Sequence, residues 1–181
     1  MHYYAAFLRG IMPSNPNMSG AKLRGVFEGL GFAAVDSVLA SGNLVFASEE
    51  SDAASLECRI QSALSAELGI PGHAIVRSRE VLQRLWDSDP FDGRRHDRGN
   101  YLTATFLKTG EPKLPVPATG SALFRVVGYD APARVVLAIT DNSVAGTTPD
   151  FMSWVERTLG TDITTRTWAT VGRVLRKFPA Q

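Results

Sequence analysis

A chain of 181 residues with 44% hydrophobic content is long enough to bury one large core or two small ones. Nineteen basic and eighteen acidic residues give a formal net charge of +1, which excludes a global field that would draw the protein to nucleic acid or a membrane surface. The single cysteine, Cys58, excludes an internal disulfide framework and a cysteine-based metal cage. No apolar run reaches the ~18 residues of a membrane helix and no secretory signal is recognisable, so we expect a cytoplasmic protein without membrane contact.

The chain begins with a predicted strand and a predicted helix. Residues 3–9 are apolar on both faces, which is typical of a strand that is covered on both sides. Ser19 is a suitable N-cap for the helix that follows, and Gly31 is a suitable end. The apolar positions of this helix recur at helical spacing and are Leu23, Val26, Phe27 and Leu30.

Two β-rich runs come next, at residues 34–39 and 44–47, and the turn residues between them predict a hairpin. A second helix is predicted over about residues 53–68, and a further strand over residues 73–77. The resulting order is strand, helix, strand, strand, helix, strand. This order is typical of a ferredoxin-like unit.

A polar run, DGRRHDRGN, follows Phe91 and predicts a linker. We therefore place a domain boundary near residue 95. Residues 1–95 are expected to form the ferredoxin-like unit with an extra short helix, and residues 96–181 a second α+β unit that ends in a C-terminal helix.

The predicted strands of the second unit repeat the strand order of the first. They lie at residues 101–107, 122–129, 134–140 and 162–165. Residues 108–118 contain three prolines and cannot form the helix that a full copy needs between its first two strands. Helices are expected over residues 148–159 and 167–178. The predicted fold class is α+β, with a ferredoxin-like βαββαβ N-terminal unit and a second, modified α+β unit of related strand order.

A spaced set of short motifs runs almost from end to end of the chain. In order they are LRGI, LGF, SGN, RSxE with a following leucine, DPF, the strand YLTATFL and the terminal RTWATV. With them the chain resembles the bacterial family catalogued as domain of unknown function 1697. The resemblance implies an α+β protein built on ferredoxin-like units. It gives no catalytic residues, because the family has no established activity.

Two segments depart from the pattern of that family. Residues 12–17 read MPSNPN where the family usually has a glycine-rich segment, and residues 166–170 read RTWAT, without the two asparagines usual there. If those positions bind a ligand in the family, this member binds it differently or not at all.

The first candidate site is the loop that follows the first predicted strand. Arg9 and Gly10 lead toward the helix capped by Ser19, and the free backbone N–H groups of a helix N-terminus favour an anion. The nucleotide-loop signatures GxxxxGK[ST] and GxGxxG are absent. The alternative is structural: Gly10 permits a turn, Ser19 caps the helix, and Arg9 pairs with a carboxylate.

The second candidate site is the predicted hairpin tip of Ser41, Gly42 and Asn43. These residues either form the turn itself or donate hydrogen bonds to a ligand.

Arg166, just before the last helix, would join Arg9 in clamping an anion. Its neighbour Trp168 belongs to the apolar stripe of that helix and is predicted to lie in the core.

Metal and cofactor chemistry finds little support. The three histidines are far apart in sequence, and Cys58 has no CxxC partner, so we expect no metal and no cofactor.

Three classes of function stay open. The residues favour a non-catalytic protein that binds a small anion or a protein partner, over an enzyme of undetermined reaction that uses the same loops.

The third class is an RNA-binding module. Its basis is the presence of aromatic residues on predicted strands, namely Tyr3, Tyr4, Phe7 and Phe46. The RNA-recognition signature is missing and the net charge is near zero, so we expect no nucleic-acid partner.

Overall fold

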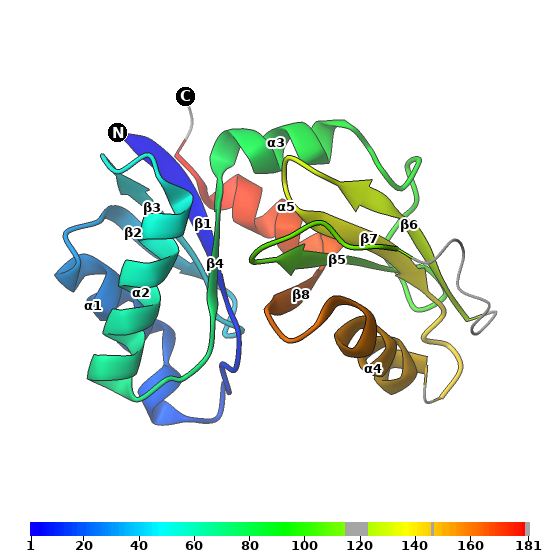
Figure 1. Cartoon of the computed structure of the whole chain (residues 1–181), viewed down its shortest axis with the longest axis horizontal. Coiled ribbons are helices and arrows are strands. Elements are labelled where there is room, and N and C mark those ends of the chain that lie inside the picture. Colours follow the sequence, from blue (N-terminus) through cyan, green and yellow to red (C-terminus); the bar gives the residue numbers. More distant parts are fainter. Residues whose placement is uncertain (115–122, 146, 180–181) are drawn as a thin grey trace. The chain divides into compact units, whose positions relative to one another are not determined.

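A computed structural model describes residues 1–114, 123–145 and 147–179, with the side chains of 147–149 left aside. It is an α+β structure with two four-stranded antiparallel sheets (Figure 1). The elements in chain order are β1 (His2–Leu8), η1 (Pro16–Met18), α1 (Gly20–Gly29), β2 (Ala33–Val38), β3 (Asn43–Ser48), α2 (Ala53–Leu68), β4 (Ala74–Ser78), α3 (Arg79–Asp87), β5 (Tyr101–Leu107), β6 (Phe124–Asp130), β7 (Val135–Thr140), α4 (Thr147–Leu159), β8 (Ile163–Thr167) and α5 (Trp168–Lys177). The predicted α+β class is thereby confirmed.

The first sheet has the strand order β2-β3-β1-β4, with every neighbouring pair antiparallel. Its helices begin and end where side chains satisfy the terminal backbone groups. The N–H of Lys22 donates to Ser19 Oγ at the start of α1, and the N–H of Ala54 donates to Asp52 Oδ1 at the start of α2. Gly69 ends α2 in the left-handed conformation, with φ of 64°.

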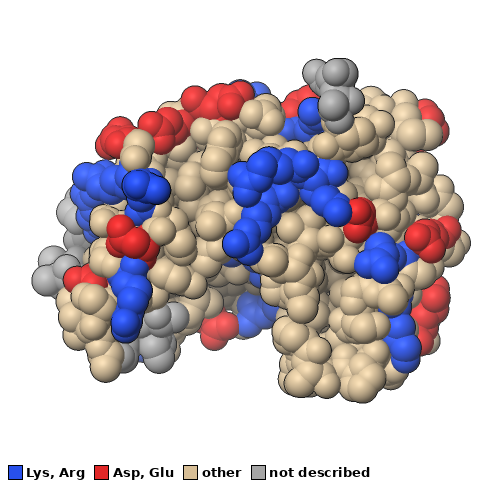
Figure 2. Space-filling model, turned by 180° about the vertical axis from the view of Figure 1, so that it is seen from behind, with Lys and Arg blue, Asp and Glu red and all other residues tan. Residues whose placement is uncertain are grey.

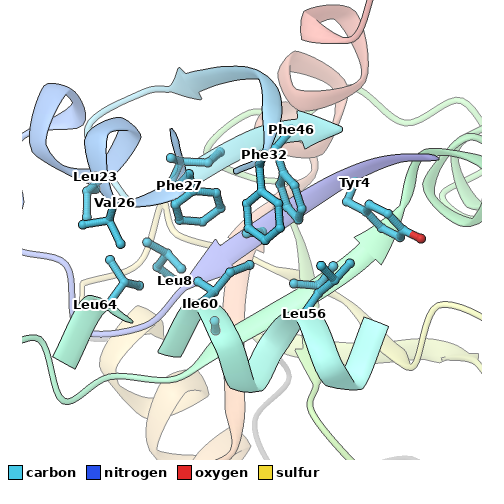
Figure 3. Packing of buried hydrophobic residues seen from close by; sticks show 14 of the residues in the cluster. Tyr4, Leu8, Leu23, Val26, Phe27, Phe32, Phe46, Leu56, Ile60 and Leu64 are labelled. Atoms are coloured by element: carbon cyan, nitrogen blue, oxygen red, sulfur yellow. The ribbon is translucent and has the colours of Figure 1, made fainter. Parts of the chain in front are cut away.

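One face of this sheet forms a closed apolar core with α1 and α2 (Figure 3). Alternate residues of β1, Tyr4 and Leu8 among them, point into it, because side chains alternate between the two faces of a strand. Phe46 of β3 packs edge-on against Phe27 of α1, with 5.4 Å between the ring centroids. The apolar spacing predicted for α1 therefore does face the core.

The second sheet has the order β6-β7-β5-β8. This is the same order as in the first sheet, with each strand number raised by four. Helix α4 stands between β7 and β8, as α2 stands between β3 and β4, and packs Phe151 and Val155 onto the sheet. Residues 108–114 form no helix; the remainder of the proline-rich segment, 115–118, lies outside the described residues, as does residue 122 of the predicted second strand.

Trp168 lies at the start of α5 and is buried, as its helical spacing predicted. Its ring stacks on Trp86 with 4.7 Å between centroids and meets Phe91 edge-on at 5.2 Å. Gly172, one turn further along α5, lies so close that a Cβ atom there would be 2.6 Å from the Trp86 ring. The DPF and RTWATV motifs, far apart in sequence, thus pack together.

The chain forms two compact units, Met1–Gln83 with Arg173–Gln181, and Arg84–Gly172. The end of α5 belongs to the first unit because Phe178 contacts Tyr3 at 6.4 Å between rings and lies under the Arg79 guanidinium. This division differs from the boundary expected near residue 95. That domain boundary stays a prediction, because a compact unit need not be an independently folding domain. Among the described residues, no helix is long and apolar enough to cross a membrane.

Candidate ligand-binding site

Threonines gather on one face of the second sheet. Thr103 of β5 stands opposite Thr167 of β8, and Thr105 stands opposite Thr165. Residues directly opposite each other share a face of the sheet. Thr103 also stands opposite Ala138 of β7, which packs in the core that α4 covers. The threonines therefore lie on the face that α4 covers in part.

A cavity of about 170 Å³ opens on this face. Its described polar lining includes one arginine, Arg166, together with four threonines and one amide, namely Thr103, Thr140, Thr165, Thr167 and Asn142. Tyr101 and, from α4, Phe151 and Met152 supply its apolar walls. The helix-covered face of the first sheet is filled instead by residues such as Leu8, Leu44 and Phe46.

Three of the four threonine hydroxyls are bonded within the protein. Thr103 Oγ1 donates to the carbonyl of Ala138 at 3.3 Å. Thr165 Oγ1 is 2.9 Å from Thr105 Oγ1, and Thr167 Oγ1 is 2.9 Å from Thr170 Oγ1. These bonds hold the cavity wall in place.

The fourth threonine and the amide differ from these three hydroxyls. Thr140 Oγ1 and Asn142 Oδ1 are buried and have no hydrogen-bond partner in the part of the chain that the structure describes. Thr140 is only 1% exposed. An unpaired buried polar group costs about 1–3 kcal/mol of stability. Both unpaired oxygens belong to residues that line the same cavity.

The turn after β7 fixes Asn142 beside Thr140. The N–H of Asn142 donates to the carbonyl of Arg98 at 2.8 Å. The carboxylate of Asp141 accepts from the N–H of Ser143 at 2.9 Å and from its hydroxyl, and these bonds lower the pKa of Asp141. The backbone of Asn142 is thus held by its bond to Arg98, within a turn that the bonds between Asp141 and Ser143 stabilise.

Arg166, a residue predicted from sequence, also lines this cavity. It stands opposite Ala104, so its side chain leaves β8 on the face away from Thr165 and Thr167. Its guanidinium donates to Thr164 Oγ1 at 2.7 Å and to the carbonyl of Thr165 at 3.0 Å. Burial lowers the pKa of Arg166 to about 10, which leaves it protonated at neutral pH.

The predicted loops of the first unit meet at the end of β1. The N–H of Leu8 donates to the carbonyl of Gly42 at 2.8 Å, and a Cβ on Gly42 would lie 2.5 Å from the Ile11 side chain. Asn43 is buried, and its amide donates to the carbonyl of Val38 at 2.9 Å and to Ser41 Oγ at 3.0 Å. The SGN residues therefore have a structural role in this hairpin.

The other predicted residues of that unit also take part in the fold. Gly10 has a φ of +78°, and the N–H of Arg9 donates to the carbonyl of His73 at 2.8 Å. Ser19 caps α1. Arg9 and Arg166 belong to different compact units, and the anion clamp between them stays a prediction.

Thr103, Thr140 and Asn142 were missed by the sequence reasoning. A signal was present: threonine alternates with apolar residues in YLTATFL and recurs in TTRT, in segments that were predicted to be extended. Threonine favours strands, however, so its presence there does not by itself indicate a site.

The two sheet-and-helix units define the class of this protein as α+β, and a family match makes it more specific. The chain belongs to the family described as "Protein of unknown function (DUF1697)", whose sequence model matches residues 1–125. The resemblance inferred from the motifs is thereby confirmed, although RTWATV lies beyond the matched residues.

A solved structure is similar over nearly the whole chain. It is that of the conserved bacterial protein SP0830 from Streptococcus pneumoniae, with a TM-score of 0.70, 18% identity and coverage of 97% of each chain. At this identity the likeness shows the fold alone. No curated protein matches the chain.

Proposed function

We propose that this protein binds a small molecule in the cavity on the threonine face of its second sheet, and that it does so without catalysing a reaction. One observation carries the proposal: Thr140 Oγ1 and Asn142 Oδ1 are buried at one cavity without a partner among the described residues. Folded proteins rarely leave such groups unpaired, and a ligand that hydrogen-bonds both would remove their cost.

The cavity has the lining of a small-molecule site and a size that suits a very small ligand. A cavity of about 150 Å³ holds one benzene molecule, so the 170 Å³ observed here suits a ligand of similar size. Apolar walls with a few placed polar groups are typical of ligand pockets. Phe151 and Tyr101 supply the apolar walls here, and Thr140 and Asn142 supply the placed polar groups.

The described lining favours binding over catalysis. A threonine hydroxyl becomes a nucleophile when a general base stands beside it. Here the described neighbours of Thr140 in the cavity wall offer hydroxyls, an amide, a thioether, aromatic rings and a guanidinium. These groups bind and orient a molecule rather than exchange protons with it at neutral pH.

The RNA alternative is disfavoured by where the strand aromatics lie. Tyr4 and Phe46 stack on each other inside the first core, with 5.6 Å between centroids, and Tyr3 contacts Phe178. A base-stacking sheet would display these rings. Figure 2 shows, on the face drawn, basic side chains in separate groups with neutral and acidic surface between them.

We also infer that the first unit is ferredoxin-like, which its element and strand order support.

A fragment screen by ligand-observed NMR tests the proposal. The wild-type protein, Thr140→Val and the matched control Thr109→Val, at an exposed position after β5, would be screened against the same uncharged and charged fragments. We expect a subset of fragments to bind the wild type and the control but not Thr140→Val. A screen in which no fragment loses its signal in Thr140→Val would contradict the proposal.

A further inference from the structure

The two unpaired oxygens also indicate which chemical groups the ligand carries. An amide oxygen only accepts hydrogen bonds, so Asn142 Oδ1 requires a donor from the ligand. A hydroxyl both donates and accepts, so Thr140 Oγ1 is satisfied by either kind of group. A ligand hydroxyl, which donates one bond and accepts two, satisfies both oxygens.

The rest of the polar wall presents further acceptors. The Thr103 hydroxyl uses its one proton on the carbonyl of Ala138, which leaves its lone pairs for a donor in the cavity. Together with Asn142 Oδ1, this hydroxyl gives the wall two acceptor positions, which suits a ligand that brings more than one donor. Hydroxyl groups at neighbouring positions provide them in a small volume.

The described lining also bears on the charge of the ligand. Arg166 is its one charged residue, and the bonds that its Nη1 makes go to Thr164 Oγ1 and the carbonyl of Thr165 within β8. The described wall contains no carboxylate that would pair with a ligand cation. The apolar sides, Phe151 and Tyr101, suit the C–H face of a ring or short carbon chain.

We infer that the ligand is an uncharged, hydroxyl-rich compound of monosaccharide size or smaller, bound through its hydroxyls by Asn142 and Thr140. This inference rests on the proposed function, because it takes the same cavity as the site. The inference goes beyond the proposed function by naming the chemical class of the ligand. At this site it replaces the anion that was expected from sequence with a neutral polyol.

The test is a titration with defined probes. Ribose, myo-inositol and glycerol serve as neutral polyols, and ribose 5-phosphate and glycerate as charged counterparts, each titrated by ligand-observed NMR. We expect at least one neutral polyol to bind more tightly than its charged counterpart. Thr140→Val should weaken that binding about fivefold to tenfold, as for the loss of one hydrogen bond, while Thr109→Val should leave it unchanged.

Asn142→Asp tests the direction of the second bond. The aspartate keeps an acceptor oxygen at the same place, so a polyol that donates to it should still bind, with affinity equal to the wild type or higher. Loss of polyol binding in this variant would overturn the inference. The thermal unfolding midpoint of each variant, measured beside the titrations, verifies that it is folded.

The remaining outcomes separate the two proposals. Binding of the charged probes alone, with loss of that binding in Thr140→Val, would overturn the polyol inference and leave the proposed function standing. If no probe and no fragment of the earlier screen depends on Thr140, both are overturned. If fragments depend on Thr140 but no neutral polyol binds, the polyol inference alone is overturned.

Discussion

Trp86 and Trp168 stack with their ring planes 16° apart and 4.7 Å between centroids, and Gly172 is the residue that lets α5 approach this pair. A Cβ on Gly172 would lie 2.6 Å from the Trp86 ring, closer than any real contact. We predict that Gly172→Ala destabilises the protein by up to about 2 kcal/mol. Overpacking of this kind costs about 1–3 kcal/mol, which outweighs the gain of about 1 kcal/mol in helix propensity.

The matched control is Gly25→Ala, in the middle of α1. No atom lies within 4 Å of a Cβ built there, and the backbone is helical. This variant should stabilise the protein by about 0.5–1 kcal/mol. Urea denaturation of both variants gives the comparison, and equal stability changes in the two would show that Gly172 is not constrained by Trp86.

A second prediction contrasts two buried threonines on one sheet face. Thr140→Val removes a hydroxyl that has no partner in the described structure and should stabilise the unliganded protein by about 1 kcal/mol. Thr105→Val breaks the bond to Thr165 Oγ1 and should destabilise it by about 1 kcal/mol. Chemical denaturation without added ligand measures both. If Thr140→Val is the more damaging of the two, its hydroxyl is used in the fold.

A third prediction concerns the buried ion pair of Glu57 and Arg77, which are 3% and 4% exposed. Glu57 Oε1 accepts from the N–H of Val76 at 2.8 Å and from Arg77 Nη1 at 3.4 Å. Glu57→Leu should destabilise the protein by about 3–5 kcal/mol, because a buried charge loses its partner. The double variant Glu57→Leu with Arg77→Met should recover part of that loss. Stability is measured by urea denaturation. If the loss in the double variant equals the sum of the losses in Glu57→Leu and Arg77→Met, the two residues are not coupled.

A fourth prediction concerns pH and the end of α5. Lys177 Nζ lies 2.7 Å from Asp36 Oδ2, and this bond is the main cause of the lowered pKa of Asp36. The pair therefore stabilises the fold above the ordinary carboxyl pKa of 3.8, and the contribution is lost as pH falls through the lowered folded pKa. Both side chains are about half exposed, so the contribution is at most about 1 kcal/mol.

The measurement is the stability difference between the wild type and Lys177→Met at several pH values. The difference should be present at pH 7, shrink at high salt, and vanish in acid below the folded pKa of Asp36. A difference that is as large in acid as at pH 7 would mean that Lys177 acts through packing of its carbon chain.

Sequence patterning predicted the elements of the first unit because its helices and strands have one clear apolar face. The stripe that includes Leu23 and Phe27, and the alternation of β1, both point to one closed core. Trp168 was placed in the core for the same reason. Spacing alone does not show which unit a stripe packs against, and the contact of Phe178 with Tyr3 could not be predicted.

The candidate site was harder to predict because it depends on contacts between distant strands. Thr103, Thr140 and Thr167 come together only through the register of β5 with its two neighbours. The residues singled out in sequence, such as Ser41 and Asn43, carry strong local signals, and local hydrogen bonds account for those signals. Arg166 was predicted and does line the cavity, although its Nη1 donates to Thr164 Oγ1 and to the carbonyl of Thr165 within β8.

The most direct test of the cavity as a binding site is to map the strongest fragment or polyol on ¹⁵N-labelled protein. We expect saturable shifts of the backbone N–H signals of Thr103, Thr140 and Asn142, and their loss in Thr140→Val. Saturable shifts confined to the loops of Arg9 and Ser41–Asn43 would contradict it and place the ligand at the first unit instead.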